Sequence, residues 1–198
     1  TREVLEAAYQ IIASFRGKSP VPDDEILNPE YALRNGPKPK LVQCESREEQ
    51  FRVVSEMIAL LQQDAESTTC ISSAFTVSNA TAGRTNSSLN NRSARVDSDL
   101  LSLFEKNGWS VRSLSEPMAL TDLTANILTA TFQELKGFEF KNVFLLDLSD
   151  EHLMTRSIPV DELWRIAFQL YVAMTRAQEE LWLFSVGPPS KLLSPLLD

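Results

Sequence analysis

Short apolar runs alternate along this chain with segments whose apolar residues recur at helical spacing, and this alternation is what most constrains the fold. In the last such pair, Leu163, Ala167, Leu170 and Met174 recur at helical spacing, and the apolar run 181–184 follows as an expected buried strand. Alternating helices and strands are typical of a mostly parallel sheet whose faces are covered by helices. The sequence therefore predicts an α/β fold, a three-layer sandwich with a largely parallel central sheet.

Turn signals and helix caps divide the rest of the chain into elements. Residues 17–40 are rich in proline and glycine and are expected to form a long irregular connection, and the polar residues 78–95 a loop. Ser46 and Glu49 make a capping box that starts a helix, and Asp97 is a candidate cap for another. The expected helices are 2–15, the segment after Ser46, the segment from Asp97 to Gly108 and the segment from Asp161; the expected strands are 40–44, 68–77, 109–114, 126–132, 141–148 and 181–184.

Length and composition exclude several classes of protein. The chain has 198 residues, of which 43% are hydrophobic and 23% charged, enough for one globular domain with a substantial core. No apolar run approaches the roughly 18 residues of a membrane span, so we expect no membrane partner and a cytoplasmic location. The formal charge of −8 is unlike that of a self-sufficient nucleic-acid-binding module, because basic side chains that neutralise phosphates drive such binding. Local contacts to nucleic acid within a larger protein are still compatible with it.

The residue types that bind metals or form hydrolytic triads are scarce. His152 is the only histidine, which excludes a two-histidine metal site and leaves no basis for a Ser/His/Asp triad. Cys44 and Cys70 are isolated in the sequence, and we expect two buried thiols in a reducing environment. The sequence therefore predicts no metal site.

A phosphate-binding loop is also missing from the sequence. Residues 17–19, Gly-Lys-Ser, imitate the end of such a loop, but Ile12 stands where the pattern needs a glycine. Asp147 follows an apolar run, as the magnesium-binding aspartate of many nucleotide sites does. Because the sequence lacks the phosphate-binding loop that would accompany such an aspartate, we interpret Asp147 as a strand-end residue.

Thr175 and Arg176 fall where the last expected helix ends, a position from which side chains can face a cleft. The fixed planar cation of arginine suits an anionic ligand with bidentate geometry. The alternative is an ordinary helix-terminal arginine that complements the helix dipole.

Two stretches of the chain carry sequence motifs. Residues 127–146 read ILTATFQELKGFEFKNVFLL, and residues 170–180 read LYVAMTRAQEE. Together they resemble motifs V and VI of the UvrD/Rep-type DNA helicases of superfamily one, whose pattern is roughly T-x-H-x-x-K-G-L-E-F followed by L-Y-V-A-x-T-R-A. Gln133 and Phe138 stand where the family usually has histidine and leucine, and the arginine-rich lead-in to motif VI is thin. The matching residues are Thr131, Lys136, Gly137, Glu139 and Phe140 in motif V, and Leu170, Tyr171, Val172, Ala173, Thr175, Arg176 and Ala177 in motif VI.

The resemblance implies that residues 1–198 form a single helicase C-terminal domain of the RecA-like type, with motifs V and VI and no inserted accessory domain. In these helicases two RecA-like domains sandwich ATP and move along single-stranded DNA. The N-terminal domain supplies the phosphate-binding loop and most of the Mg²⁺ ligands. ATP with Mg²⁺, single-stranded DNA and an N-terminal RecA-like domain are therefore the implied ligands and partners, in a DNA-repair setting. The chain opens on Thr1 without a methionine, so we expect it to be part of a longer protein.

Carried over by position, the resemblance implies roles for five residues. Arg176 corresponds to the arginine that reaches the γ-phosphate across the domain interface, where charge develops during phosphoryl transfer. Glu139 corresponds to the acidic residue that meets the nucleotide at the ribose, and Gly137 lets the nucleotide-binding turn approach closely. Thr131 and Gln133 fall where the family touches the DNA strand. The segment 131–139 is expected beyond the carboxyl end of a strand, where sheets of this type bind ligands.

Alternatives remain open both for single residues and for the function. Lys136 is either a ligand contact or a solvated side chain, and we interpret Tyr171 as a core residue rather than a stacking platform.

The chain is either half of an ATP-driven DNA helicase or translocase, or a helicase-like interaction module that has lost ATP turnover. Gln133 and the thin lead-in to motif VI motivate the second class. A phosphate-binding loop upstream of Thr1 would favour the first.

We predict that the isolated chain has no ATPase activity, because nothing in it cradles the β- and γ-phosphates. The measurement is steady-state phosphate release by the purified chain. Turnover near the roughly 1 to 100 per second of phosphoryl-transfer enzymes, in a preparation free of contaminating ATPases, would contradict this prediction.

Overall fold

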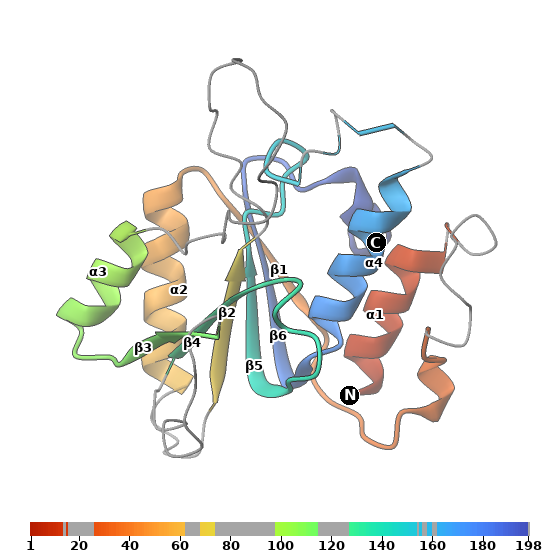
Figure 1. Ribbon diagram of the computed structural model, residues 1–198, viewed down its shortest axis with the longest axis horizontal. Helices are drawn as coiled ribbons and strands as arrows, with labels where there is room; N and C mark the ends of the chain where they lie inside the picture. Colours follow the sequence, from red (N-terminus) through yellow and green to blue (C-terminus); the bar gives the residue numbers. More distant parts are fainter. Residues whose placement is uncertain are drawn as a thin grey trace, which may run out of the picture.

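A six-stranded sheet forms the middle of the molecule, as the computed structural model shows for residues 1–13, 15, 26–61, 68–73, 98–114, 127–153, 155, 158–159 and 162–197 (Figure 1). The strand order is β1-β6-β5-β2-β4-β3, and every pair of neighbours is parallel. The strands are β1 (Lys40–Cys44), β2 (Thr69–Ser73), β3 (Val111–Ser113), β4 (Ile127–Thr131), β5 (Phe140–Leu146) and β6 (Ala177–Val186). The predicted parallel sheet is thus confirmed.

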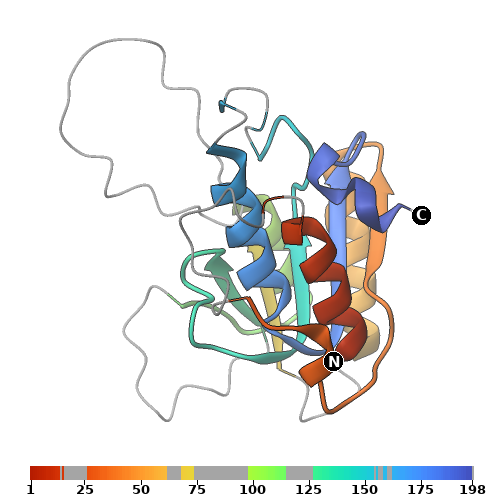
Figure 2. The same ribbon diagram turned by 90° about the vertical axis from the view of Figure 1, so that its right-hand side faces the viewer.

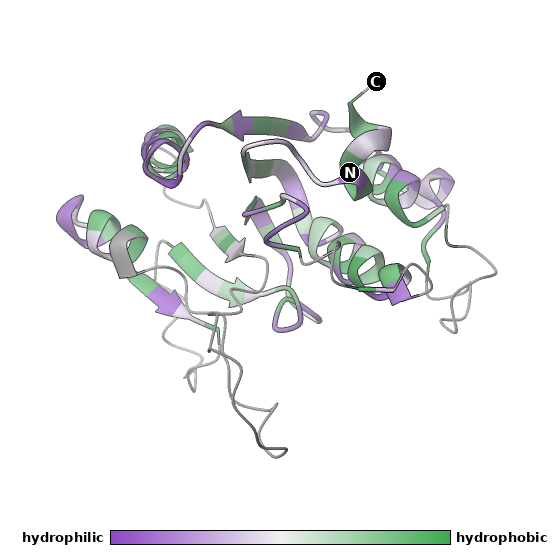
Figure 3. Cartoon of the chain, turned by 90° about the horizontal axis from the view of Figure 1, so that it is seen from above, coloured by the Kyte–Doolittle hydropathy of each residue, from purple (hydrophilic) through white to green (hydrophobic). Residues whose placement is uncertain are grey.

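Helices cover both faces of the sheet. On one face α1 (Arg2–Ala13) and α4 (Leu163–Met174) lie side by side, as Figures 1 and 2 show. On the other face lie α2 (Arg47–Leu61) and α3 (Ser98–Lys106), and Figure 3 shows the same three layers from above, coloured by hydropathy. Two short 3-10 helices, η2 (Pro29–Tyr31) and η5 (Lys191–Leu196), complete the described elements. None of the helices in the described ranges is long and apolar enough to cross a membrane.

The sandwich follows from where the apolar side chains fall. All five residues of β4 are buried, so this strand carries hydrophobic contacts on both of its faces. Val4, Ala8 and Ile11 of α1 recur at helical spacing and are at most 2% exposed. Buried residues form one core between the sheet and α1/α4 and a second between the sheet and α2/α3. The predicted three-layer α/β sandwich is therefore confirmed.

The start of α2 confirms the expected cap with one change. The Ser46 hydroxyl accepts the Glu49 backbone N–H at 3.2 Å, as in a capping box. The Glu49 carboxylate accepts the backbone N–H of Glu45 at 2.7 Å, one residue further back than the motif requires. The expected cap at Asp97, the loop 78–95 and the tripeptide 17–19 lie outside the described residues.

Both cysteines are buried free thiols, as expected from their isolation in the sequence. Burial raises the pKa of the Cys44 and Cys70 thiols. A raised pKa keeps a thiol protonated and unreactive at neutral pH.

The last strand is longer than its apolar residues predicted. The sequence predicts a strand over 181–184, but β6 begins at Ala177, the last matching residue of motif VI. Phe140 of β5 aligns with Ala177, and Asn142 aligns with Glu180. This backbone pairing extends the strand through polar residues that apolar periodicity cannot detect.

The connection from β4 to β5 crosses one face of the sheet without a helix. Both strands flank β2 in parallel, so residues 132–139 must return the chain from the carboxyl edge, where strands end, to the amino edge, where they begin. Phe132 and Leu135 are buried in the core on the α1/α4 side and fix this crossover to the sheet. Motif V therefore spans the sheet from one edge to the other.

Candidate functional site

Two of the motif residues lie next to each other at the amino edge of the sheet. Glu139 directly precedes β5, and Arg176 directly precedes β6, the strand paired with β5. The Phe140 backbone N–H donates to the Arg176 carbonyl at 3.0 Å, which continues the strand pairing into both motifs. Motifs V and VI, far apart in sequence, are thus joined through the backbone.

The Arg176 side chain is half-buried and folds back on the end of α4. Its Nε donates to the Val172 carbonyl at 3.0 Å, and its Nη2 donates to the Thr175 hydroxyl at 3.2 Å. The carbonyl belongs to the last turn of the helix, where carbonyls have no partner within the helix. The guanidinium therefore complements the helix end, as the dipole interpretation expects, and it keeps further N–H donors for an anion.

Glu139 presents an exposed carboxylate beside motif VI. Its Oε2 accepts from Gln178 Nε2 at 2.8 Å, and Gln178 lies two residues beyond Arg176 on β6. Gly137 adopts a φ of +92°, the left-handed region that side chains rarely occupy, and a Cβ there would meet no atom within 4 Å. The turn before Glu139 therefore needs glycine for its backbone conformation and leaves open space in front of it.

Thr131 lies at the opposite edge from Arg176. It ends β4 and is 8% exposed, and its hydroxyl accepts the Glu134 backbone N–H at 3.2 Å. In return, the Glu134 carboxylate accepts the Thr131 backbone N–H at 2.7 Å. This reciprocal pair starts the motif V turn, so Thr131 holds the turn, a structural role that the sequence did not predict.

Gln133 has its side chain in solvent within that turn, and its backbone carbonyl accepts the Lys136 N–H at 3.3 Å. Lys136 is also exposed, as expected if its side chain is solvated. Neither side chain is needed to close the turn, so both are available to a ligand.

The expected position of the site at the carboxyl ends of strands is correct for Thr131 and wrong for Glu139. The segment 131–139 leaves the carboxyl end of β4 but reaches the amino end of β5. The reason is that β4 and β5 are parallel strands of one sheet and begin at the same edge, so the connection between them must recross the sheet. The two groups of candidate residues therefore face two different edges.

Tyr171 is a core residue, as interpreted from the sequence. It is 3% exposed, and its hydroxyl accepts the Leu27 backbone N–H at 2.7 Å. Burial raises the pKa of its hydroxyl. A base cannot stack on a ring that is covered in this way, so Tyr171 instead anchors the backbone at Leu27 to α4.

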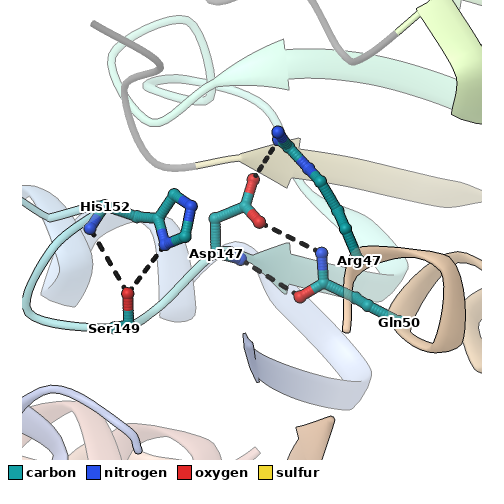
Figure 4. Close-up of polar contacts among 5 residues, drawn as sticks. All are labelled: Arg47, Gln50, Asp147, Ser149 and His152. Carbon is teal, nitrogen blue, oxygen red and sulfur yellow. Dashed lines mark hydrogen bonds and ion pairs between the residues drawn. The ribbon is translucent and has the colours of Figure 1, made fainter. Parts of the chain in front are cut away.

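A buried polar cluster that the sequence did not predict surrounds Asp147, directly after β5 (Figure 4). The Asp147 carboxylate accepts from Arg47 Nη2 at 3.0 Å and from Gln50 Nε2 at 3.1 Å. Asp147 is 1% exposed and has a φ of +60°, a conformation that aspartate tolerates better than most residues. The strand-end interpretation of Asp147 is confirmed, and its carboxylate ties β5 to the first turn of α2.

Ser149 and His152 lie close to this cluster and form a turn contact (Figure 4). The Ser149 hydroxyl is 2.7 Å from His152 Nδ1 and accepts the His152 backbone N–H at 3.3 Å. Among the described residues no carboxylate bonds to the ring, so the pair lacks the third member of a hydrolytic triad. Within the same residues no group of three metal-ligating side chains is found.

Asp150 connects the segment after β5 to the C-terminal part of the chain through hydrogen bonds. Its Oδ1 accepts from Ser190 Oγ at 2.6 Å, from Thr155 Oγ1 at 2.7 Å and from the Lys191 backbone N–H at 3.0 Å. Burial alone would raise the pKa of Asp150, but these hydrogen bonds outweigh it and lower that pKa. Asp150 is therefore a structural carboxylate.

Comparison with known proteins gives a family and a fold. The family model of the UvrD-like helicase C-terminal domain matches residues 86–186. Among solved structures, the C-terminal domain of a possible DNA helicase from Lactobacillus plantarum WCFS1 is 18% identical with a TM-score of 0.62, over 98% of this chain and 91% of that one. The C-terminal part of the Fun30 ATPase domain is 13% identical with a TM-score of 0.37, over 69% of this chain and 40% of that one, too distant to support any argument. No curated protein matches the chain.

We predict that Asp147→Ala lowers the free energy of unfolding by about 3 kcal/mol, because Arg47 loses its buried partner and alanine is strained at this φ. Asp147→Asn should cost less, since an amide oxygen still accepts and asparagine tolerates the conformation. Denaturant unfolding of the purified chain measures both values. Glu151→Ala, which removes a neighbouring exposed carboxylate, is the matched control and should change stability by less than about 0.5 kcal/mol. An alanine variant at position 147 as stable as this control would show that the cluster contributes little.

Proposed function

The chain belongs to the family of UvrD-like helicase C-terminal domains, and from this membership we propose that it completes the ATP site and contacts single-stranded DNA in an ATP-dependent DNA helicase or translocase. The observation that carries the proposal is the placement of Arg176 beside Glu139 at one edge of the sheet, with motif V running from there to Thr131 at the other edge. One continuous segment thereby connects two candidate ligand surfaces.

The amino edge has the chemistry that a nucleotide requires. The guanidinium of Arg176 can donate to phosphate oxygens in a planar, bidentate arrangement. The exposed carboxylate of Glu139 can accept from ribose hydroxyls, and the open space at Gly137 lets a ligand approach the backbone. Arg176 would act on the γ-phosphate, because a cation that meets the developing charge lowers the barrier to phosphoryl transfer.

The remaining parts of the site would come from the N-terminal RecA-like domain. Its phosphate-binding loop would hold the β- and γ-phosphates, and it would supply most of the Mg²⁺ ligands. In this arrangement residues 1–198 act as one motor domain without an inserted accessory domain.

The motif V turn supplies the proposed DNA contacts. Gln133 offers an exposed amide that both donates and accepts and that never titrates. Thr131 would hold the turn by accepting the Glu134 N–H, and its hydroxyl hydrogen remains to donate to the DNA strand. The amide of Gln133 could form a neutral hydrogen bond to sugar, phosphate or base. Such a contact does not require a basic surface, which a chain with a net charge of −8 is not expected to have.

We predict that Arg176→Ala in the complete protein lowers ATP turnover on the order of a thousandfold and affects folding stability far less, because arginine fingers act on the transition state. Arg176→Lys should also fail, since a point charge does not replace the planar fork. DNA-stimulated ATPase assays and thermal melting measure the two effects. Arg165→Ala is the control, because Arg165 has a 65% exposed side chain on the first turn of the same helix. Near-normal turnover in either Arg176 variant would show that Arg176 does not have the γ-phosphate role that motif VI implies.

We predict that Gln133→Ala in the complete protein weakens single-strand binding about tenfold at most, because a neutral hydrogen bond contributes about 0.5 to 1.5 kcal/mol. DNA-stimulated ATPase should fall more than basal ATPase, and Gln133→His should be tolerated. Gln43→Ala, which removes another exposed glutamine, on β1, is the matched control. If Gln133→Ala instead lowers the melting temperature and basal ATPase together, with stimulation proportionately unchanged, Gln133 is a structural residue and the DNA contact is refuted.

A further inference from the structure

The hydroxyl of Thr175 has a fixed direction at the end of α4. Thr175 is the C-cap residue of the helix, and its Oγ1 donates to the Val172 carbonyl at 2.9 Å. Since the only hydroxyl hydrogen is used in that bond, the oxygen can only accept from other groups. Arg176 Nη2 provides the donor, at 3.2 Å.

Two hydrogen bonds therefore hold the Arg176 guanidinium in place. Nη2 donates to Thr175 Oγ1, and Nε donates to the same Val172 carbonyl that Thr175 uses. A guanidinium has five N–H donors in a rigid plane, so two contacts on one edge fix its orientation and leave the remaining donors directed elsewhere. The side chains of Thr175 and Arg176 are both half-buried, which limits competition from water.

From this geometry we infer that Thr175 is a positioning residue for Arg176. It orders the guanidinium before ATP arrives, so that less side-chain freedom is lost in the transition state. The inference rests on the proposed role of Arg176 at the γ-phosphate. Thr175 itself does not touch the nucleotide.

The test uses the complete protein and four variants at these two positions, one of which is a double variant. Thr175→Val keeps the shape of the side chain and removes the acceptor, and Thr175→Ser keeps the hydroxyl. We expect Thr175→Val to lower kcat for ATP about tenfold, as for the loss of a hydrogen bond to a charged group. KM should change little, because the interaction acts in the transition state. Thr175→Ser should stay within about twofold of the parent, and all variants should melt at similar temperatures.

A double-mutant cycle decides whether Thr175 acts through Arg176. In the Arg176→Ala background, Thr175→Val should cause no further loss of kcat, because the group it orients is gone. The positioning role would be overturned if Thr175→Val lowered kcat equally in both backgrounds, if it changed KM alone, or if Thr175→Ser lowered kcat as much as Thr175→Val. It would also be overturned if Thr175→Val left kcat unchanged while Arg176→Ala inactivated the protein. That last result would leave the proposed function intact. Near-normal turnover of Arg176→Ala would overturn the proposed function, and the positioning role with it.

Discussion

The parallel pairing of β5 with β6 is the interaction on which the candidate site depends. Because the two strands begin at the same edge, the residues that precede them, Glu139 and Arg176, become neighbours although they come from different motifs. The bond between the Phe140 N–H and the Arg176 carbonyl sets this register at its first step. The backbone pairing of β5 with β6 thus determines which side chains meet at the site. A slip by one residue would also turn the apolar side chains of β6 from one core to the other.

The crossover of motif V gives the domain a second property. Its first residue, Thr131, is tied to the carboxyl edge by the exchange with Glu134, and its buried residues Phe132 and Leu135 hold it against the sheet. Its last residue, Glu139, is bonded to Gln178 at the amino edge. The two edges are therefore connected by a short backbone segment that is anchored at both ends and along its length. That arrangement suits a domain in which two ligands must affect each other.

Local patterns in the sequence were sufficient for the layer architecture and for the location of motifs V and VI. The stripe on α4, the buried runs of β4 and β5 and the Ser46 cap all depend on nearby residues. The contact of Arg47 with Asp147 joins residues 100 positions apart, and no local pattern encodes it. The edge on which Glu139 lies could not be deduced from composition either, because it depends on which strands pair and in which direction. For the same reason the polar start of β6 was missed, since it is a strand through its partner and not through its side chains.

The strand order has a consequence for how the chain is made. β1 pairs with β6, with Lys40 opposite Trp182, and α1 packs on α4 and η5, so the N-terminal elements find their main partners only near the C-terminal end. At synthesis rates of about 5 to 20 residues per second, those partners follow on the order of ten seconds later. During this interval the apolar stripe of α1 is uncovered, and the emerging chain is open to aggregation. During synthesis, the apolar stripe of α1 therefore cannot be buried against α4 and η5 until the C-terminal part of the chain has been made.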